Sequence, residues 1–192
     1  MAYTTCMKDI KIIGIGGYAR TGKDTFANKL KKILKENGYN GATFGFADKL
    51  KRDLNHFLSK NMGISSHTDT KSEKNIIRPI LVAYGEAQRA CDSDYWIKKI
   101  ERTIDNAIDL GVICIVTDVR YENEAEWISK NGTLIFLERE QIKPPNSQEI
   151  ENTPKVRQKA KIIVNWPTTS DEDKLDDIVR GLVQQLTKEN NA

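Results

Sequence analysis

The run VICIVT at residues 112–117 is the feature that most limits what this chain can fold into. Its side chains are apolar on both faces, as in a strand of a parallel sheet that helices cover on each side. Four other short apolar, β-branched runs occur, at residues 10–15, 42–46, 133–137 and 161–165. Segments with helical spacing separate the runs, and strands that alternate with helices predict an α/β fold with a mostly parallel sheet.

The helical segments are recognised by apolar residues that recur every three or four positions. The expected helices carry these stripes or ranges: Phe26/Leu30/Ile33/Leu34, Leu50/Leu54/Phe57/Leu58, Trp96/Ile97/Ile100/Ile104/Ile108, residues 121–130 and residues 171–186. The first should end near Asn37 and Gly38, which favour a helix C-terminus. The third should begin after Asp92 or Ser93 and end at Gly111.

Two polar segments are expected to form loops. Residues 59–72, SKNMGISSHTDTKS, contain few large apolar side chains, and residues 141–154, QIKPPNSQEIENTP, contain three prolines. The second lies between the fourth and fifth predicted strands. A loop of that length in a compact domain is either a functional lid or a surface insertion without function, and both readings stay open.

Composition excludes several classes of protein. The 192 residues suit one domain, and Lys plus Arg (30) exceed Asp plus Glu (27) by only three, which argues against a protein that coats nucleic acid or an anionic membrane. Cys6, Cys91 and Cys114 form no CxxC pair, and His56 and His67 have no partners at metal-ligand spacing, which argues against a zinc site or disulfide framework. Neither a signal-peptide pattern nor a run of about 18 apolar residues occurs, so we expect a cytoplasmic protein.

A glycine-rich turn, GGYARTGKDTF at residues 16–26, follows the first predicted strand and opens the first predicted helix. Within it, residues 17–23 fit GxxxxGK, the phosphate-binding P-loop. Backbone N–H groups of such a turn point at phosphate oxygens, the helix N-terminus adds positive charge, and the lysine reaches the β- and γ-phosphates. The expected ATP-binding residues are Gly17, Ala19, Arg20, Thr21, Gly22, Lys23, Asp24 and Thr25. The alternative is a plain strand-to-helix turn with an exposed lysine.

Asp24 stands where a P-loop usually has Ser or Thr. A carboxylate can bind Mg²⁺ directly or through water, because this ion prefers hard oxygen ligands and keeps several waters. An acid in the first turn of a helix also suits the helix dipole. Thr25 could supply the usual hydroxyl instead, and the sequence does not decide between the two.

The third predicted strand runs into Thr117, Asp118, Val119 and Arg120. Ligands of open parallel sheets bind beyond the carboxyl ends of the strands, so Asp118 and Arg120 should reach the same edge as the P-loop. Asp118 could hold a hydrated metal ion and Arg120 could bind a phosphate. The alternative is an Asp–Arg pair that caps the next helix.

Cations also gather between the second and third predicted strands. Among them Arg89 is the best candidate for a ligand contact, because it ends one helix beside acids and aromatic residues. Trp96 continues an apolar stripe, which favours packing over base stacking. Arg139, Lys155 and Arg157 could supply cations from a lid that excludes water.

Four stretches carry a resemblance: ARTGKDTFA, FADKLK, YGEAQRACDSDYWI and TDVRYENEAEWI. Over roughly residues 10–165 the chain resembles the deoxynucleoside monophosphate kinases of bacteriophages. The resemblance implies a P-loop kinase of adenylate-kinase-like, three-layer architecture with a five-stranded parallel sheet. It also implies one domain over residues 1–192, with a monophosphate-binding insertion at about 47–110 and a lid at about 139–158.

The implied reaction transfers the γ-phosphoryl group of ATP to a (deoxy)nucleoside monophosphate with Mg²⁺. The resemblance places arginines, including Arg120, around the transferring group. The residues themselves predict Lys23, Asp118 and Arg120 as catalytic residues and Asp118 with Asp24 or Thr25 as metal ligands. The implied monophosphate-binding residues are Asp48, Lys51, Arg89, Asp92 and Trp96. The chain departs from the family in the lid, where an arginine pair is expected and only Arg139 and a distant Arg157 occur.

Several alternatives remain at this level. The P-loop does not identify the acceptor, so the nearest alternative is a kinase of another small acceptor, such as dephospho-coenzyme A or phosphomevalonate. A regulatory or structural protein could use the P-loop as a nucleotide switch. A nucleic-acid motor is disfavoured by the small net charge and the short chain. Base and sugar preference, and whether the chain forms a homodimer, stay open, and a phage-encoded protein would work in the host cytoplasm.

Overall fold

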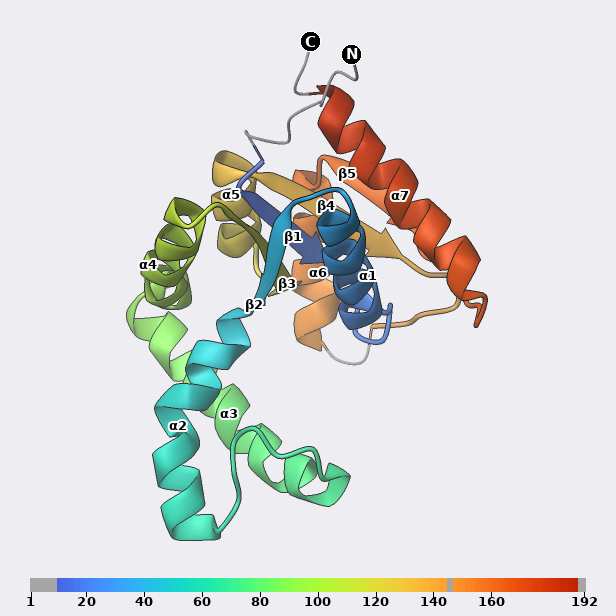
Figure 1. Ribbon diagram of the computed structural model, residues 1–192. Helices are drawn as coiled ribbons and strands as arrows, with labels where there is room; N and C mark the ends of the chain where they lie inside the picture. The colour runs from blue at the N-terminus through green and yellow to red at the C-terminus, as the bar shows by residue number, and fades with distance from the viewer. Residues whose placement is uncertain (1–9, 145–146, 190–192) are drawn as a thin grey trace. The chain divides into compact units, whose positions relative to one another are not determined.

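The computed structural model describes residues 10–144 and 147–189 of the chain (Figure 1). Its elements in order are β1 (Ile12–Gly16), α1 (Lys23–Glu36), β2 (Asn40–Phe44), α2 (Phe46–Met62), α3 (Lys71–Cys91), α4 (Tyr95–Asp109), β3 (Val112–Val119), α5 (Glu122–Asn131), β4 (Thr133–Glu138), α6 (Ser147–Lys159), β5 (Ile162–Asn165) and α7 (Glu172–Glu189). The five strands pair in parallel in the order β2-β3-β1-β4-β5. This confirms the predicted α/β fold with a five-stranded parallel sheet.

Side chains of a strand alternate between the two faces of the sheet, and helices cover both faces. Ile13 and Ile15 of β1 join a core that includes residues of α1 and α7. Gly14 and Gly16 face the other way, where a Cβ on them would meet Ile128 of α5 and Val156 of α6. The sheet is therefore the middle of three layers, and the two glycines let α5 and α6 pack closely on its second face.

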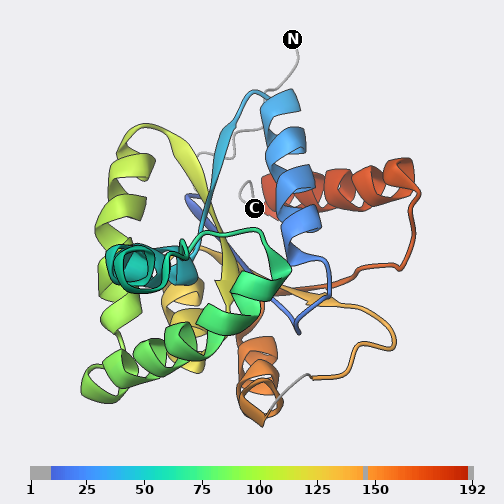
Figure 2. The same cartoon turned by 90° about the horizontal axis from the view of Figure 1, so that it is seen from below.

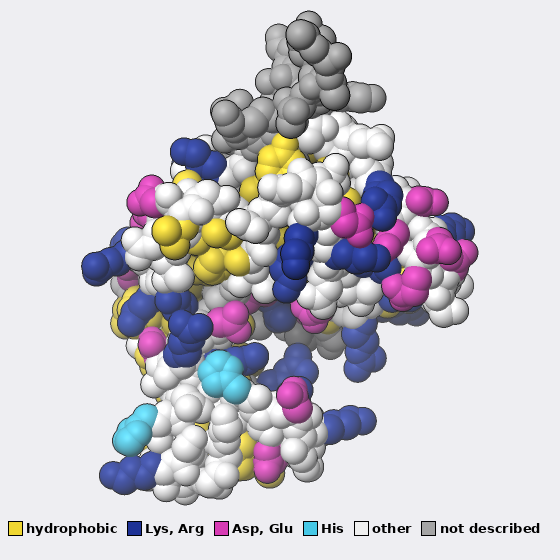
Figure 3. All heavy atoms as spheres, viewed as in Figure 1, with side chains coloured by type: hydrophobic (Ala, Val, Ile, Leu, Met, Phe, Trp, Pro, Cys, Tyr) yellow, Lys and Arg dark blue, Asp and Glu magenta, His cyan; other side chains and the backbone are white. Residues whose placement is uncertain are grey.

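An ion-pair cluster joins α1 to α7 on the first face. Lys29, which is buried, donates to Glu172 and to Asp176 at 2.5 Å each, and Lys32 pairs with Asp176 at 2.7 Å. The two lysines hold the pKa of Asp176 down at about 2. Over these helices basic and acidic side chains alternate on the face seen in Figure 3. The cluster fixes the helix that begins in the glycine-rich turn against the C-terminal helix.

The chain divides into two compact units. The sheet unit contains the chain up to Phe44 and from Ile104 onward, and the helical unit is residues 45–103. In the helical unit the rings of Tyr84 and Tyr95 meet that of Trp96 edge to face, at 5.9 and 4.9 Å between centroids. Most of the segment predicted to bind a monophosphate lies in the helical unit, and that role stays a prediction. No helix within the described residues is long and apolar enough to cross a membrane.

The predicted loops are shorter than expected. α2 runs to Met62 and α3 begins at Lys71, so the first loop shrinks to residues 63–70. The prediction of a loop throughout residues 141–154 is wrong, because α6 starts at Ser147 and includes Pro154. Thr153 and Val156 are buried on one face of α6, and this tertiary packing outweighs the low helix propensity of proline.

A close backbone approach makes Gly132 the most sensitive position of the turn between α5 and β4. A Cβ there would lie 2.1 Å from the carbonyl oxygen of Ile12 in β1. We expect Gly132→Ala to lower the free energy of unfolding by about 3 kcal/mol, because backbone in the centre of the sheet must shift. Urea unfolding followed by far-UV circular dichroism measures the change.

The matched control is Gly181→Ala in α7, where a Cβ would meet none of the described atoms within 4 Å. This variant should gain up to about 1 kcal/mol, because alanine favours helix over glycine. A Gly132→Ala protein as stable as the unmutated one would contradict the close approach.

Candidate functional site

The turn between β1 and α1 has the backbone of a phosphate-binding loop. Gly17 and Gly22 adopt φ of 142° and 94°, and Arg20 lies in the left-handed region at 68°. At Gly17 a Cβ would also lie 2.7 Å from the carbonyl oxygen of Leu137, so no larger residue fits. Turns with this alternation of conformations form concave nests of N–H groups that bind anions. α1 follows at once, and its N-terminus adds partial positive charge.

Lys23 lies across this loop. Its ammonium donates to the carbonyl oxygens of Gly17 and Tyr18, at 2.8 Å each. Burial, first, and the nearby positive charge of Arg120, second, lower the pKa of Lys23 to about 8. Negative charges on Glu149, Asp24 and Asp118 act in the opposite direction. The lysine therefore sits at the centre of a group of charged residues from α1, the end of β3 and α6.

The end of β3 brings Asp118 and Arg120 to the loop. Val119 pairs in register with Gly16, the last residue of β1, after a bulge in the ladder. Beyond it, the buried carboxylate of Glu124 accepts the N–H groups of Arg120 at 2.9 Å and Tyr121 at 3.2 Å. These bonds fix the turn from which the exposed Arg120 projects. The four predicted residues Lys23, Asp24, Asp118 and Arg120 thus lie in one neighbourhood, and their individual roles stay predictions.

The predicted residues of the helical unit have local partners. Trp96 is 1% exposed and its Nε1 donates to the carbonyl oxygen of Gly85 at 3.3 Å, so the ring packs inside the unit. The Asp92 carboxylate accepts the N–H of Asp94 at 3.1 Å and pairs with Lys98 at 2.7 Å. The bond to Lys98 lowers the pKa of Asp92.

The three remaining predicted residues of the helical unit are cations and an acid on its helices. Arg89, in the last turn of α3, lies 4.0 Å from Glu86. Asp48 lies in the first turn of α2, and Lys51 lies one turn further along that helix. Binding roles for these residues stay predictions.

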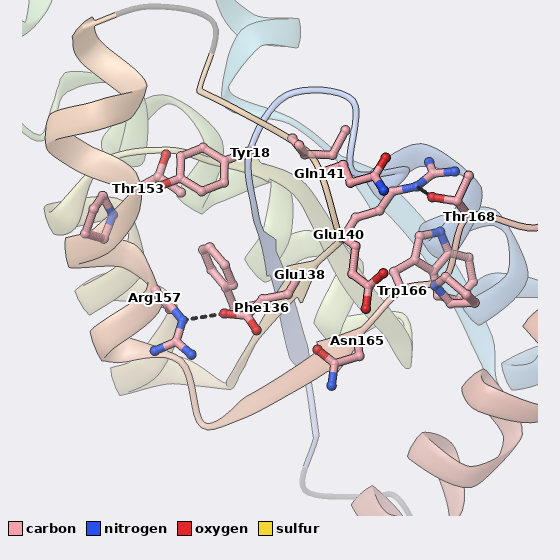
Figure 4. Close-up of a pocket in the computed structure, with 14 residues that line it drawn as sticks. Tyr18, Phe136, Glu138, Glu140, Gln141, Thr153, Arg157, Asn165, Trp166 and Thr168 are labelled. Carbon is pink, nitrogen blue, oxygen red and sulfur yellow. Dashed lines mark hydrogen bonds and ion pairs between the residues drawn. The ribbon is translucent and has the colours of Figure 1, made fainter.

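A cavity of about 920 Å³ lies beside the phosphate-binding loop at the ends of β4 and β5 (Figure 4). Its lining residues are Tyr18, Phe136, Glu138, Arg139, Glu140, Gln141, Ile142, Thr153, Pro154, Arg157, Asn165, Trp166, Pro167 and Thr168. Arg139 donates to the Thr168 hydroxyl at 2.8 Å, and Arg157 donates to Glu138 at 2.5 Å. The two predicted lid arginines, distant in sequence, therefore line the same cavity.

Trp166 connects this cavity to the loop. A Cβ on Gly22 would lie 2.7 Å from the Trp166 Nε1, and the Trp166 ring meets Phe26 of α1 edge to face at 5.2 Å. The sequence interpretation did not include Trp166, although it directly follows the fifth strand. The rule that places ligands beyond strand ends would have found it.

The residues at the loop also suit a magnesium ion. Among residues 10–144 and 147–189 no cluster of three or more His, Cys, Asp or Glu side chains could hold a metal by itself. Mg²⁺ commonly takes only one or two carboxylates and completes its shell with substrate phosphates and water. The carboxylates of Asp24 and Asp118 both influence Lys23, and the exposed Thr25 adds a hydroxyl in the first turn of α1. This donor set fits the ion.

Comparison with known proteins gives a family and several similar folds. The sequence model of the family described as phosphomevalonate kinase matches residues 15–133. None of the curated proteins matches the chain in sequence. A shikimate kinase from Bacteroides thetaiotaomicron is 14% identical with a TM-score of 0.49, covering 91% of this chain and 97% of its own.

Two further solved structures are similar to the same extent. A shikimate kinase from Aquifex aeolicus is 15% identical with a TM-score of 0.47, covering 94% of this chain and 99% of its own. A mutant APS kinase from Mycobacterium tuberculosis is 12% identical with a TM-score of 0.46, covering 92% of this chain and 98% of its own.

Proposed function

Because the chain belongs to the phosphomevalonate kinase family, we propose that it transfers the γ-phosphoryl group of ATP to the phosphate of a small phosphorylated acceptor. Membership of this family makes the chain a P-loop kinase. One observation supports the proposal most. Lys23 lies across a phosphate-binding loop, and the charges of Arg120, Asp24 and Asp118 are near enough to shift its pKa. Phosphoryl transfer requires charged groups of this kind in one place, because the two anionic substrates repel each other when they are brought together.

The proposed chemistry needs little covalent help from the protein. An oxygen of the acceptor phosphate attacks the γ-phosphorus, the bond to the β–γ bridging oxygen breaks, and ADP leaves with that electron pair. Lys23 and the loop N–H groups hold the β- and γ-phosphates, and Arg120 binds oxygens of the group in transfer. Asp118, with Asp24 or Thr25, would hold Mg²⁺, which neutralises phosphate charge when bound.

The remaining parts of ATP and the acceptor have proposed places too. The cavity between Arg139 and Trp166 has the size and lining expected for the base and sugar of ATP. Arg157 and Arg139 would approach the phosphates from the lid side. The acceptor would bind through the helical unit, with Arg89, Lys51 and Asp48 as its proposed contacts.

We propose phosphomevalonate as the first acceptor type, because the family match carries that description. Deoxynucleoside monophosphates are the second candidate, and the stretches DVRYENEAE and YGEAQRACDSDYW favour them. Both acceptors are phosphate monoesters that become diphosphates, so one site chemistry serves either.

An acceptor panel tests the proposal. ADP release is followed with ATP and Mg²⁺ against phosphomevalonate, dephospho-coenzyme A and the common dNMPs and NMPs, with an acceptor-free reaction as the control. We expect phosphomevalonate to raise ADP release well above the control. Turnover with dNMPs alone would move the assignment to the second candidate. ATP binding without turnover on any acceptor would favour a nucleotide-binding regulatory protein.

A further inference from the structure

An acidic side chain bonds to the phosphate-binding loop. The backbone N–H of Ala19 donates to the carboxylate of Glu149, with 2.8 Å between N and Oε2. Glu149 lies in the first turn of α6, 130 positions away in sequence. Figure 2 shows that α6 and the loop between β1 and α1 approach each other. The same carboxylate is close enough to Lys23 to oppose the lowering of its pKa.

The position of this carboxylate matters because of what the loop is built to bind. N–H groups of such a loop serve phosphate oxygens, and a carboxylate oxygen is an anionic acceptor of the same kind. One N–H at 2.8 Å from the Glu149 oxygen cannot also donate to a phosphate oxygen at that distance. Two anions at one N–H also repel each other. The N–H of Ala19 can therefore bind either Glu149 or a phosphate oxygen, but not both at once.

The surrounding packing allows the first turn of α6 to yield without loss of the helix. Val156, two turns further along, is buried against Gly16, where a Cβ would lie 2.8 Å from its side chain. Ser147 and Gln148, at the start of α6, are exposed. The C-terminal half is therefore anchored on the sheet, while the turn that carries Glu149 has little buried surface to lose.

We propose that Glu149 competes with the phosphates of ATP for the N–H of Ala19 and thereby sets the affinity of the protein for ATP. The inference rests on the proposed use of ATP. Binding of the nucleotide displaces the carboxylate and with it the first turn of α6. Thr153 and Pro154 of the same helix line the cavity. Binding of the phosphates therefore also affects the side of the cavity that α6 forms, where the rest of the nucleotide would bind.

Removal of the competitor should tighten ATP binding. Isothermal titration of Glu149→Ala with ATP and Mg²⁺ should give a Kd about tenfold lower than that of the unmutated protein, the size of one hydrogen bond to a charged group. Glu149→Gln keeps an acceptor oxygen without the charge, and its Kd should fall about threefold. Inorganic tripolyphosphate should show the same order, because it carries the phosphates without a base.

Glu151→Ala is the matched control. Glu151 lies on the same helix and pairs with Lys155 at 3.7 Å, so the variant changes net charge equally but not the loop. Its Kd for ATP should equal that of the unmutated protein. Hydrogen exchange supplies a second measurement: ATP should speed exchange of residues 147–153 in the unmutated protein and change it much less in Glu149→Ala.

A Glu149→Ala protein that binds ATP no more tightly than the unmutated one would overturn the inference. So would equal tightening by Glu151→Ala, which would reduce the effect to net charge. Failure of the proposed function looks different, because the acceptor panel would then show no transfer while Glu149→Ala still tightened ATP binding.

Discussion

Lys23→Ala should abolish ATP-dependent phosphotransfer and leave the protein folded. The ammonium is the only charge of this loop that bridges two of its carbonyl groups among the described residues, and it is placed to neutralise the β- and γ-phosphates. We expect kcat/KM to fall about a thousandfold or more, since the lysine acts on charge that moves during transfer. ADP release with the best acceptor of the panel measures the loss.

The fold should survive because the folded protein holds the charged lysine at a cost. Its pKa of about 8 lies below the ordinary value of 10.5, so folding favours the uncharged side chain, and removing it forfeits no stabilising charge. Lys35→Ala, an exposed position in the last turn of α1, is the matched control and should keep normal turnover. A folded Lys23→Ala protein with near-normal turnover would refute the assignment.

The same pKa provides a check on Lys23 in the unmutated protein. The ammonium loses its proton as the pH rises through about 8, and only the charged form attracts phosphate. kcat/KM for ATP, which reports the free protein, should therefore decline above that pH. kcat should decline less, because bound phosphates stabilise the charged lysine.

Arg120→Ala has the second-largest expected effect, a loss of about a hundredfold to a thousandfold in kcat. Arg120 lies in a turn that the buried Glu124 fixes by accepting two backbone hydrogen bonds. Its positive charge is near enough to Lys23 to lower the pKa of that lysine. An arginine placed beside the transferring group binds oxygens whose charge grows in the transition state, so the rate should fall more than ATP affinity. Steady-state kinetics together with ATP titration separates the two quantities.

Arg180→Ala is a suitable control for the loss of an arginine, because Arg180 pairs with Glu36 on the surface of α1 at 2.8 Å. It should change neither kcat nor ATP affinity. A loss of ATP affinity with kcat unchanged in Arg120→Ala would make Arg120 a residue of ground-state binding alone.

The phosphate-binding loop was predictable because its signal is local. A strand, six loop residues and a helix N-terminus follow each other directly in the chain, and no distant contact is needed to recognise them. The arrival of Asp118 and Arg120 was also predictable, since parallel strands deliver their ends to one edge of the sheet. Short apolar runs such as VICIVT identified the ends of the five strands to within two residues.

The contact of Glu149 with Ala19 could not be predicted in the same way. It joins residues 130 positions apart and depends on how α6 docks on the sheet. The prolines around α6 concealed the helix itself, because burial of Thr153 and Val156 is a tertiary effect that local propensity does not contain. Acceptor choice is equally hidden, since it depends on a few contacts whose geometry the sequence does not reveal.

Trp166 can serve as an intrinsic fluorescence probe of the phosphate-binding loop and the cavity. The indole lies against Gly22 of the phosphate-binding loop and lines the cavity, so its fluorescence will respond to whatever occupies that cavity. Trp96 is enclosed in the helical unit and its emission reports on that unit instead. The chain has three tryptophans, the third being Trp127 of α5. Replacing them in turn would let events in the two units be timed separately in one chain without any added dye.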